Sequence, residues 1–175
     1  MYPTKEKAIE LIEIAEKNNP GAWVKHSYAV ADCAMKIAKK CNMNADKSYV
    51  LGLLHDIGRY FGVKHFAHIY DGYIYMEELG YDDVARVCLS HSFSTQNVED
   101  YIGNFDSSKE GIQFISDKLS NMNFDDYDKL IQLCDALAGT QVVDITTRMN
   151  DVKHRYGYYP QDKWEANLHL KKYFE

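Results

Sequence analysis

Apolar residues recur at helical spacing along most of the chain, and no stretch alternates with the period of two that a half-buried strand requires. The spacing predicts helices over residues 4–17, 22–41, 46–57, 66–79, 82–91, 126–138, 146–156 and 161–174. Residues 100–123 are less regular, and we expect them to form a short helix and a lid. The predicted fold class is therefore all-α, a compact helical bundle.

Capping residues and glycines mark several of the predicted helix ends. Thr4 is a candidate N-cap for the first helix, which Asn18-Asn19-Pro20-Gly21 ends. We expect Gly58 to stop the third helix, which would place His55 and Asp56 in its last turn. A histidine and a carboxylate at such a helix end could open onto a cleft.

Length and charge bound the organisation of the protein. A chain of 175 residues suffices for one domain, with the last two helices, 146–174, packed on the rest. The net charge of -6 gives no basic surface for a nucleic-acid polymer or an anionic membrane. No apolar window could span a bilayer and no signal peptide is visible, so we expect a cytoplasmic protein that is a monomer or a homodimer.

Histidines and carboxylates fall repeatedly on the apolar faces of the predicted helices. His26 shares a stripe with Val30 and Cys33, His91 ends another such stripe, and Asp135 lies beside a third. Each of these groups alone would be an ordinary hydrogen-bonded core residue. Buried ionisable groups are costly unless paired or metal-bound, however, so one shared metal centre would explain the whole set. The four scattered cysteines fit small buried hydrophobes better than a thiolate zinc cluster.

The doublet His55-Asp56, in the run Leu-Leu-His-Asp-Ile-Gly-Arg, is the most specific feature of this set. Adjacent residues point in different directions from a helix, so the pair could bind two neighbouring metal ions, or one ion and its water. The order of ligand types along residues 22–139 resembles that of the HD superfamily of metal-dependent phosphohydrolases, which is named for this doublet.

The resemblance implies two adjoining metal sites. His26, His55, Asp56 and Asp135 would form the first, and Asp56, His68 and His91 the second, with Asp56 bridging both. His65 lies three residues before His68 and is an alternative ligand. The spacing of His68 to Gly72 favours His68.

Two differences from better-known sequence signatures of the superfamily restrict which subfamily the chain resembles. No Gly-Tyr-Pro element of the cyclic-dinucleotide phosphodiesterases follows His91, and Arg59 stands where deoxynucleotide triphosphohydrolases carry a second histidine. The chain is more similar to small stand-alone HD hydrolases, including those that cut dinucleoside tetraphosphates symmetrically.

These ligands suggest a hydrolytic reaction on a small phosphorylated substrate, a phosphoester or a nucleotide. Mixed histidine and aspartate ligation suits one or two divalent Fe, Mn, Co, Ni or Zn ions. Two ions about 3.5–4 Å apart would activate a bridging hydroxide as the nucleophile, so loss of Asp56 should end catalysis. Arg59 could clamp a phosphate or instead cap the end of the third helix. Further candidates for substrate contact are Lys64, His65, Ser92 and Gln96.

Two rival functions remain open at this point. The same ligand framework resembles di-iron oxygenases of inositol or phosphonates, and a metal-binding HD module without catalysis is also consistent with it.

Other features of the sequence have ordinary explanations beside functional ones. Tyr70, Tyr73 and Tyr75 could stack on a nucleobase but more often such residues pack, and the basic residues of 148–155 fit a solvated helix face.

Overall fold

A computed structural model describes residues 1–175 and confirms the all-α fold class. Its helices are α1 (Lys5–Asn18), α2 (Ala22–Lys40), α3 (Ala45–Leu54), α4 (Ala67–Glu78), α5 (Asp82–Ser90), α6 (Lys109–Ser120), α7 (Asp126–Leu137), α8 (Ile145–Tyr156) and α9 (Gln161–Tyr173), with short 3-10 helices η1 (Ile57–Phe61) and η2 (Val98–Asp100). The only β interaction is an isolated bridge between Ala138 and Val142. No helix combines the length and the apolarity needed to cross a membrane.

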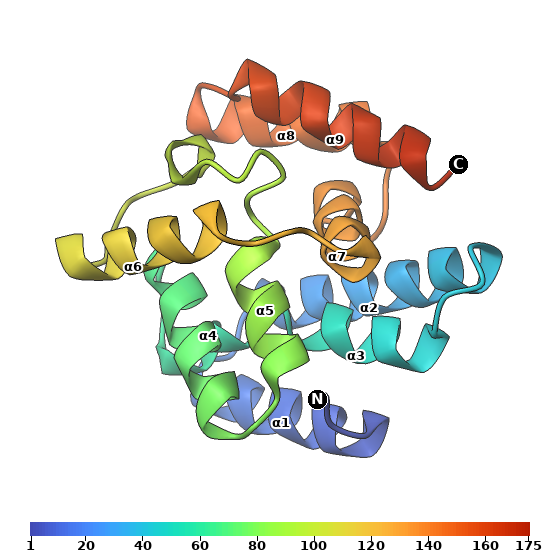
Figure 1. Ribbon diagram of the computed structural model, residues 1–175, viewed down its shortest axis with the longest axis vertical. Helices are drawn as coiled ribbons and strands as arrows, with labels where there is room; N and C mark the ends of the chain where they lie inside the picture. Colours follow the sequence, from blue (N-terminus) through green and yellow to red (C-terminus); the bar gives the residue numbers. More distant parts are fainter.

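Helix α7 lies at the centre of the arrangement and packs against α2, α3, α5, α8 and α9 (Figure 1). Helices α1, α2 and α3 form the lower part of the view, α4 and α5 pack together on one side, and α8 and α9 cover the top. The ligand candidates therefore come from elements that surround one interior region.

Three groups of buried side chains hold the helices together. The largest lies between α1, α2, α3, α5 and α7, where Ile12, Val30 and Leu54 are completely buried. An aromatic group around Phe66 and Phe93 joins the start of α4 to the end of α5 and to α6. The third group is Leu133, Ile145 and Met149, and it packs the C-terminal helices on α7.

The end of α3 differs from the prediction. The helix ends at Leu54, His55 is its C-cap, and Asp56 lies between α3 and η1. Gly58 does not stop the helix but lies inside η1, where the backbone approaches α4. A Cβ at Gly58 would be 1.9 Å from the carbonyl oxygen of His68 and 2.6 Å from the backbone nitrogen of Gly72. The glycine is needed for this close packing.

The irregular region contains one regular helix, α6, whose N-cap Ser108 accepts a hydrogen bond from the Gly111 N–H. The loop before it carries Tyr101, which packs in the aromatic group against Phe66 and Phe93. The expected helix is therefore present, while a lid function for the loop stays a prediction. Three of the four cysteines are buried, as expected, and Cys41 is exposed.

Candidate metal centre

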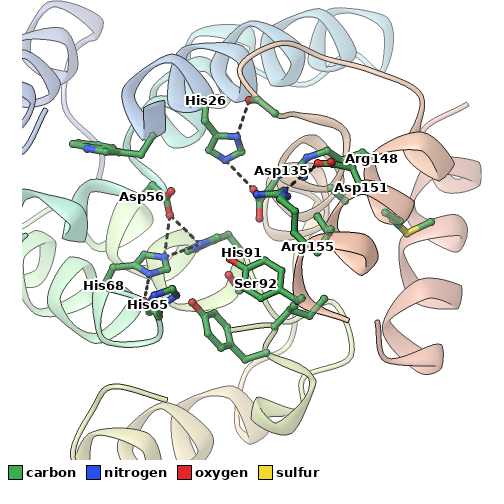
Figure 2. A pocket seen from close by; sticks show the side chains of 18 of the residues that line it. His26, Asp56, His65, His68, His91, Ser92, Asp135, Arg148, Asp151 and Arg155 are labelled. Carbon is green, nitrogen blue, oxygen red and sulfur yellow. Dashed lines mark hydrogen bonds and ion pairs between the residues drawn. The ribbon is translucent and has the colours of Figure 1, made fainter. Parts of the chain in front are cut away.

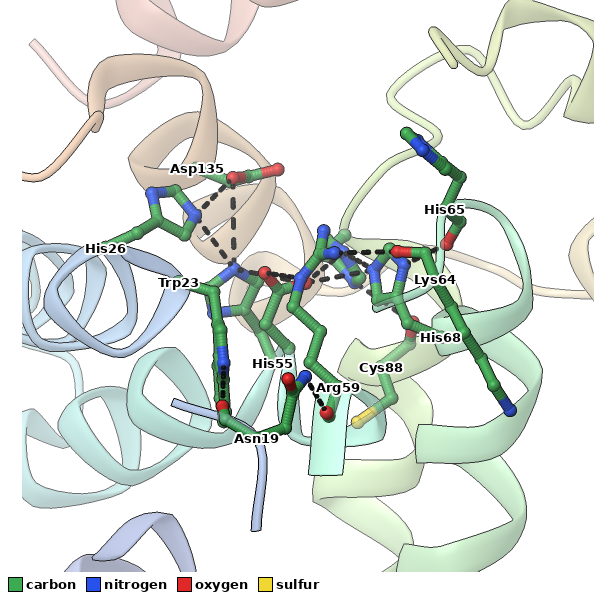
Figure 3. A network of polar contacts seen from close by, with 12 residues as sticks. Asn19, Trp23, His26, His55, Arg59, Lys64, His65, His68, Cys88 and Asp135 are labelled. Carbon is green, nitrogen blue, oxygen red and sulfur yellow. Dashed lines mark hydrogen bonds and ion pairs between the residues drawn. The ribbon is translucent and has the colours of Figure 1, made fainter. Parts of the chain in front are cut away.

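The structure brings all six predicted ligands together from five helices (Figures 2 and 3). The residues are His26 of α2, His55 and Asp56 at the end of α3, His68 of α4, His91 after α5, and Asp135 of α7. His55, Asp56, His68 and His91 are each at most 4% exposed. Side chains from such distant parts of the chain meet only because the helices pack around α7.

The first group consists of His26, His55 and Asp135, whose candidate ligand atoms all lie within 4.8 Å of one another. The Nε2 of His26 is 3.0 Å from Asp135 Oδ1 and 3.3 Å from His55 Nε2. His55 Nε2 is 3.8 Å from the same carboxylate oxygen. One cation could contact all three atoms.

The second group is centred on Asp56 Oδ1. This oxygen is 2.9 Å from His68 Nε2, 3.4 Å from His91 Nε2 and 3.9 Å from His55 Nε2. The Nε2 atoms of His68 and His91 are 3.4 Å apart. Asp56 therefore lies between the two groups, where the resemblance places a bridging carboxylate.

Backbone carbonyls fix the tautomer of all four histidines. The Nδ1–H of His26 donates to Gly139 O at 3.0 Å and that of His55 to Gly52 O at 2.7 Å. His68 donates to His65 O in the same way, and His91 donates to the carbonyls at the end of α5. A neutral imidazole that donates through Nδ1 has an unprotonated Nε2.

In their neutral forms the four histidines would therefore turn unprotonated Nε2 atoms towards the two carboxylates, with no hydrogens between them. Two neutral Nε2 acceptors 3.3 or 3.4 Å apart repel each other unless a proton or a metal cation lies between them. The donor set fits a divalent transition metal, because it mixes imidazole nitrogen with carboxylate oxygen.

The protonation states of the ligands agree with this fit. Burial lowers the pKa of His55 to about 4, so its imidazole is neutral near pH 7. Burial alone would raise the pKa of Asp56, but the Arg59 guanidinium and His68 hold it well below its usual range. Burial opposes ionisation of Asp135 too, yet the contact with His26 lowers the pKa of Asp135 and raises that of His26 in return. A metal ion would take the place of the proton that this pair shares. Both carboxylates are thus ionised and ready to bind a cation.

Arg59 contacts a ligand directly. Its Nε donates to Asp56 Oδ2 at 2.7 Å, and its Nη1 donates to the carbonyl of Lys64 at 3.0 Å. The guanidinium does not cap α3, and it leaves Oδ1 of Asp56 facing the histidines. Asn19 Nδ2 donates to the Arg59 carbonyl at 2.7 Å and anchors this segment to the end of α1 (Figure 3).

The predicted substrate contacts have different outcomes. His65 and Ser92 line the cavity beside the ligands, and His65 takes no ligand position. Lys64 also borders the cavity, but its Nζ binds Asp71 at 2.7 Å and points away from the ligands (Figure 3). Gln96 does not line the cavity. Its amide donates to two backbone carbonyls at the end of α6, so this polar side chain stabilises the end of that helix and does not contact the site.

The tyrosines predicted near His68 pack instead of lining the site. Tyr70 and Tyr73 contact Phe114, and Tyr75 stacks on Tyr60. The cavity is lined by other tyrosines, namely Tyr101, Tyr156 and Tyr159. Sequence reasoning missed them because no ligand motif lies next to them along the chain.

The cavity has a volume of about 680 Å³ and extends from five of the six ligands, all but His55, to α8 and α9. Arg148 and Arg155 line it, which corrects the expectation of a wholly solvated basic helix face, whereas Lys153 and His154 are exposed and are not part of the lining. Lys163 of α9 is a further lining residue that the sequence did not single out. The seven-residue spacing of Arg148 and Arg155, two helical turns, is the signal that could have placed them on one face.

Two buried polar atoms on residues that line the cavity have no hydrogen-bond partner, Ser94 Oγ and Gln132 Oε1. Gln132 is 2% exposed and donates through its Nε2 to Ser90 O at 3.1 Å. Buried polar groups rarely stay unsatisfied, so these atoms are candidates for contact with a ligand or with ordered water.

Comparison with known proteins agrees with the geometry of the site. The sequence pattern of the HD domain matches residues 23–140, almost the same span as the residues 22–139 that carry the resemblance. No curated protein matches the chain. The matched span contains all six ligands and covers more than half of the sequence, so the chain belongs to the HD domain family.

Proposed function

We propose that the protein is a metal-dependent phosphohydrolase that acts on a small phosphoester or nucleotide. The observation that carries the proposal is the convergence of four imidazole Nε2 atoms on two ionised carboxylates at one end of a cavity. Membership of the HD domain family supports it, because that superfamily consists mostly of metal-dependent phosphohydrolases. A cavity of about 680 Å³ suits a small molecule.

The chain's own residues can position a phosphate at this end of the cavity. When bound, divalent ions supply Lewis acidity and lower the pKa of a coordinated water. Arg59 is partly exposed to the cavity, and the guanidinium donors that Asp56 and Lys64 do not use can bind a phosphate oxygen. The first candidate for the scissile linkage is a phosphodiester bond in a small nucleotide.

Asp56 is the residue on which this proposal depends most. Its Oδ2 is held by Arg59, and its Oδ1 faces three histidines. Because one of them, His55, belongs to the first group of ligands and the other two belong to the second, Asp56 connects both groups. Replacement by asparagine keeps the shape but removes the charge. Asp46 at the start of α3 is exposed and offers a matched control for the same substitution.

The test is a hydrolysis screen of nucleotides and generic phosphoesters with protein loaded with Mn, Co, Ni, Zn or Fe. We expect phosphate release from at least one substrate, abolished by Asp56→Asn and kept by Asp46→Asn. Oxygen consumption by the iron form without hydrolysis would favour the di-iron oxygenase instead. Metal binding with neither reaction would favour a non-catalytic module.

A further inference from the structure

The cavity continues past the metal ligands to a wall that lies outside the HD domain match. Helix α8 contributes Arg148 and Arg155 to this wall, and α9 contributes Lys163. Figure 2 shows both arginine side chains pointing from α8 into the pocket. None of these three residues forms a hydrogen bond or ion pair with a metal ligand, so they need an explanation other than metal binding.

The two arginines are held in place by one shared carboxylate. Arg148 Nη1 and Arg155 Nη2 each lie 3.2 Å from Asp151 Oδ2, and Arg148 Nε donates to Ala138 O at 2.7 Å. Because a single carboxylate serves two guanidinium groups, each retains donors that can bind a further anion. Arg148 is 18% exposed and Arg155 is 50% exposed, so one is fixed deep in the wall and the other at its rim.

Lys163 has only neutral partners. Its Nζ donates to the carbonyls of Ser92 at 2.7 Å and Asp100 at 3.2 Å, which leaves a third donor free. Burial lowers the pKa of this amine to about 8, because no carboxylate pairs with it directly. An anion in the cavity would supply the missing counter-charge. Ser92 directly follows the ligand His91, so this amine is anchored to the loop next to the metal site.

The balance of charge in the cavity is opposite to that of the whole chain. Five cationic side chains line it, Arg59, Lys64, Arg148, Arg155 and Lys163, against three carboxylates, Asp56, Asp135 and Asp151. The chain as a whole has a net charge of -6. The lining therefore carries more cations than carboxylates even without metal ions. Of the five cations, only Lys64 is paired with a carboxylate outside the lining, Asp71. A polyanionic ligand would be attracted to such a cavity.

We propose that Arg148, Arg155 and Lys163 form a second anion subsite, which binds a phosphate group of the substrate other than the one at the metal ligands. The substrate class is then a small molecule with at least two phosphate groups. This inference rests on the proposed function for the first phosphate, and it adds that recognition depends on helices beyond the HD domain match.

Calorimetric titration of the Mn-loaded protein with inorganic tripolyphosphate and with orthophosphate tests the subsite without requiring turnover. Tripolyphosphate can reach both subsites, whereas orthophosphate can occupy only one at a time. We expect wild type to bind tripolyphosphate at least about 10-fold more tightly. Arg155→Gln should reduce this preference about 3- to 5-fold, as expected for one partly exposed ion pair.

Two matched variants make the result specific. Lys153→Gln removes the same charge from an exposed position of α8 that does not line the cavity, and it should leave the preference unchanged. Arg155→Lys should restore part of it. The subsite is refuted if wild type shows no preference for tripolyphosphate, or if Arg155→Gln and Lys153→Gln have the same effect. A failed hydrolysis screen with a positive titration would overturn the proposed reaction but keep the subsite.

Discussion

Replacement of Gly58 by alanine should separate the metal ligands by forcing η1 away from α4. The added Cβ would lie 1.9 Å from His68 O and 2.6 Å from Gly72 N, and both neighbours are backbone atoms that no rotamer change can move. An ordinary carbon contact requires about 3.5 Å, so the two segments must part by about 1.5 Å. The movement acts directly on His68, whose Nε2 lies 2.9 Å from Asp56 Oδ1.

The expected magnitude follows from this clash. Overpacking of a well-packed interior costs about 1–3 kcal/mol, which for a chain of this size lowers the unfolding temperature by about 2–12 °C. Displacement of a ligand by about 1 Å should reduce activity about 100-fold. Gly72→Ala should have a smaller effect, because its Cβ would lie 3.1 Å from the Gly58 nitrogen. Gly139→Ala should have the smallest effect on stability, because its nearest contacts would be 3.9 and 4.0 Å.

Thermal unfolding followed by circular dichroism, together with metal analysis of the desalted proteins, measures this series. The expected order of destabilisation is Gly58→Ala, then Gly72→Ala, then Gly139→Ala. Only the first should also lose much of its bound metal. A Gly58→Ala protein with the unfolding temperature and metal content of wild type would refute the close approach of η1 and α4.

Three further predictions concern single charged groups. Asp56→Asn should lower both metal content and activity, the latter at least about 100-fold, as measured by mass spectrometry of bound metal and by phosphate release. Arg59→Lys should lower activity about 10-fold while metal stays bound, because lysine keeps the charge but cannot hold Asp56 Oδ2 and the Lys64 carbonyl together; equal loss of metal would contradict this. Lys163 should make the free energy of unfolding of the metal-free protein rise with pH between about 8 and 10.5. In this range the amine keeps its proton in the unfolded chain but has released it in the folded protein. Denaturant unfolding of wild type and Lys163→Met at several pH values measures this effect. As the pH rises, the free energy of unfolding of wild type should increase relative to that of the variant, and a difference that does not change with pH would refute the prediction.

The helices were predictable because each carries its own periodic apolar face and local end signals. Thr4 caps α1 as the sequence indicates, and Asp125 forms a capping box with Asp128 at the start of α7 that was not anticipated. The end of α3 was misplaced for a non-local reason. Gly58 looks like a helix stop from the sequence, but it contacts α4, and a contact between separate segments leaves no signal in local spacing.

The ligand set was predictable because an imidazole or carboxylate on an apolar stripe is costly without a partner. The roles of polar residues outside that set were harder to assign. Gln96 donates to carbonyls at the end of α6, and Lys64 donates to Asp71. Nothing near either residue in the sequence indicates these partners. Arg148 and Arg155 look solvated on their own helix, and only the packing of α8 on α7 turns them towards the cavity.

The site therefore divides into two parts, the metal ligands and the cationic wall. The carbonyls that orient the histidines belong to residues 52, 65, 87, 88 and 139, all within the HD domain match, so the ligand geometry depends on that region. The cationic wall is attached through the small apolar group of Leu133, Ile145 and Met149 and through hydrogen bonds from Arg148 to Ala138 O and from Lys163 to the carbonyls of Ser92 and Asp100. If the second anion subsite forms as proposed, exchange of Arg155, which is paired with Asp151 and not with a ligand, should alter which anion binds without moving a ligand. Under the two proposals, the HD region would carry out the chemistry, and the cationic side chains of α8 and α9 would contribute to the choice of substrate.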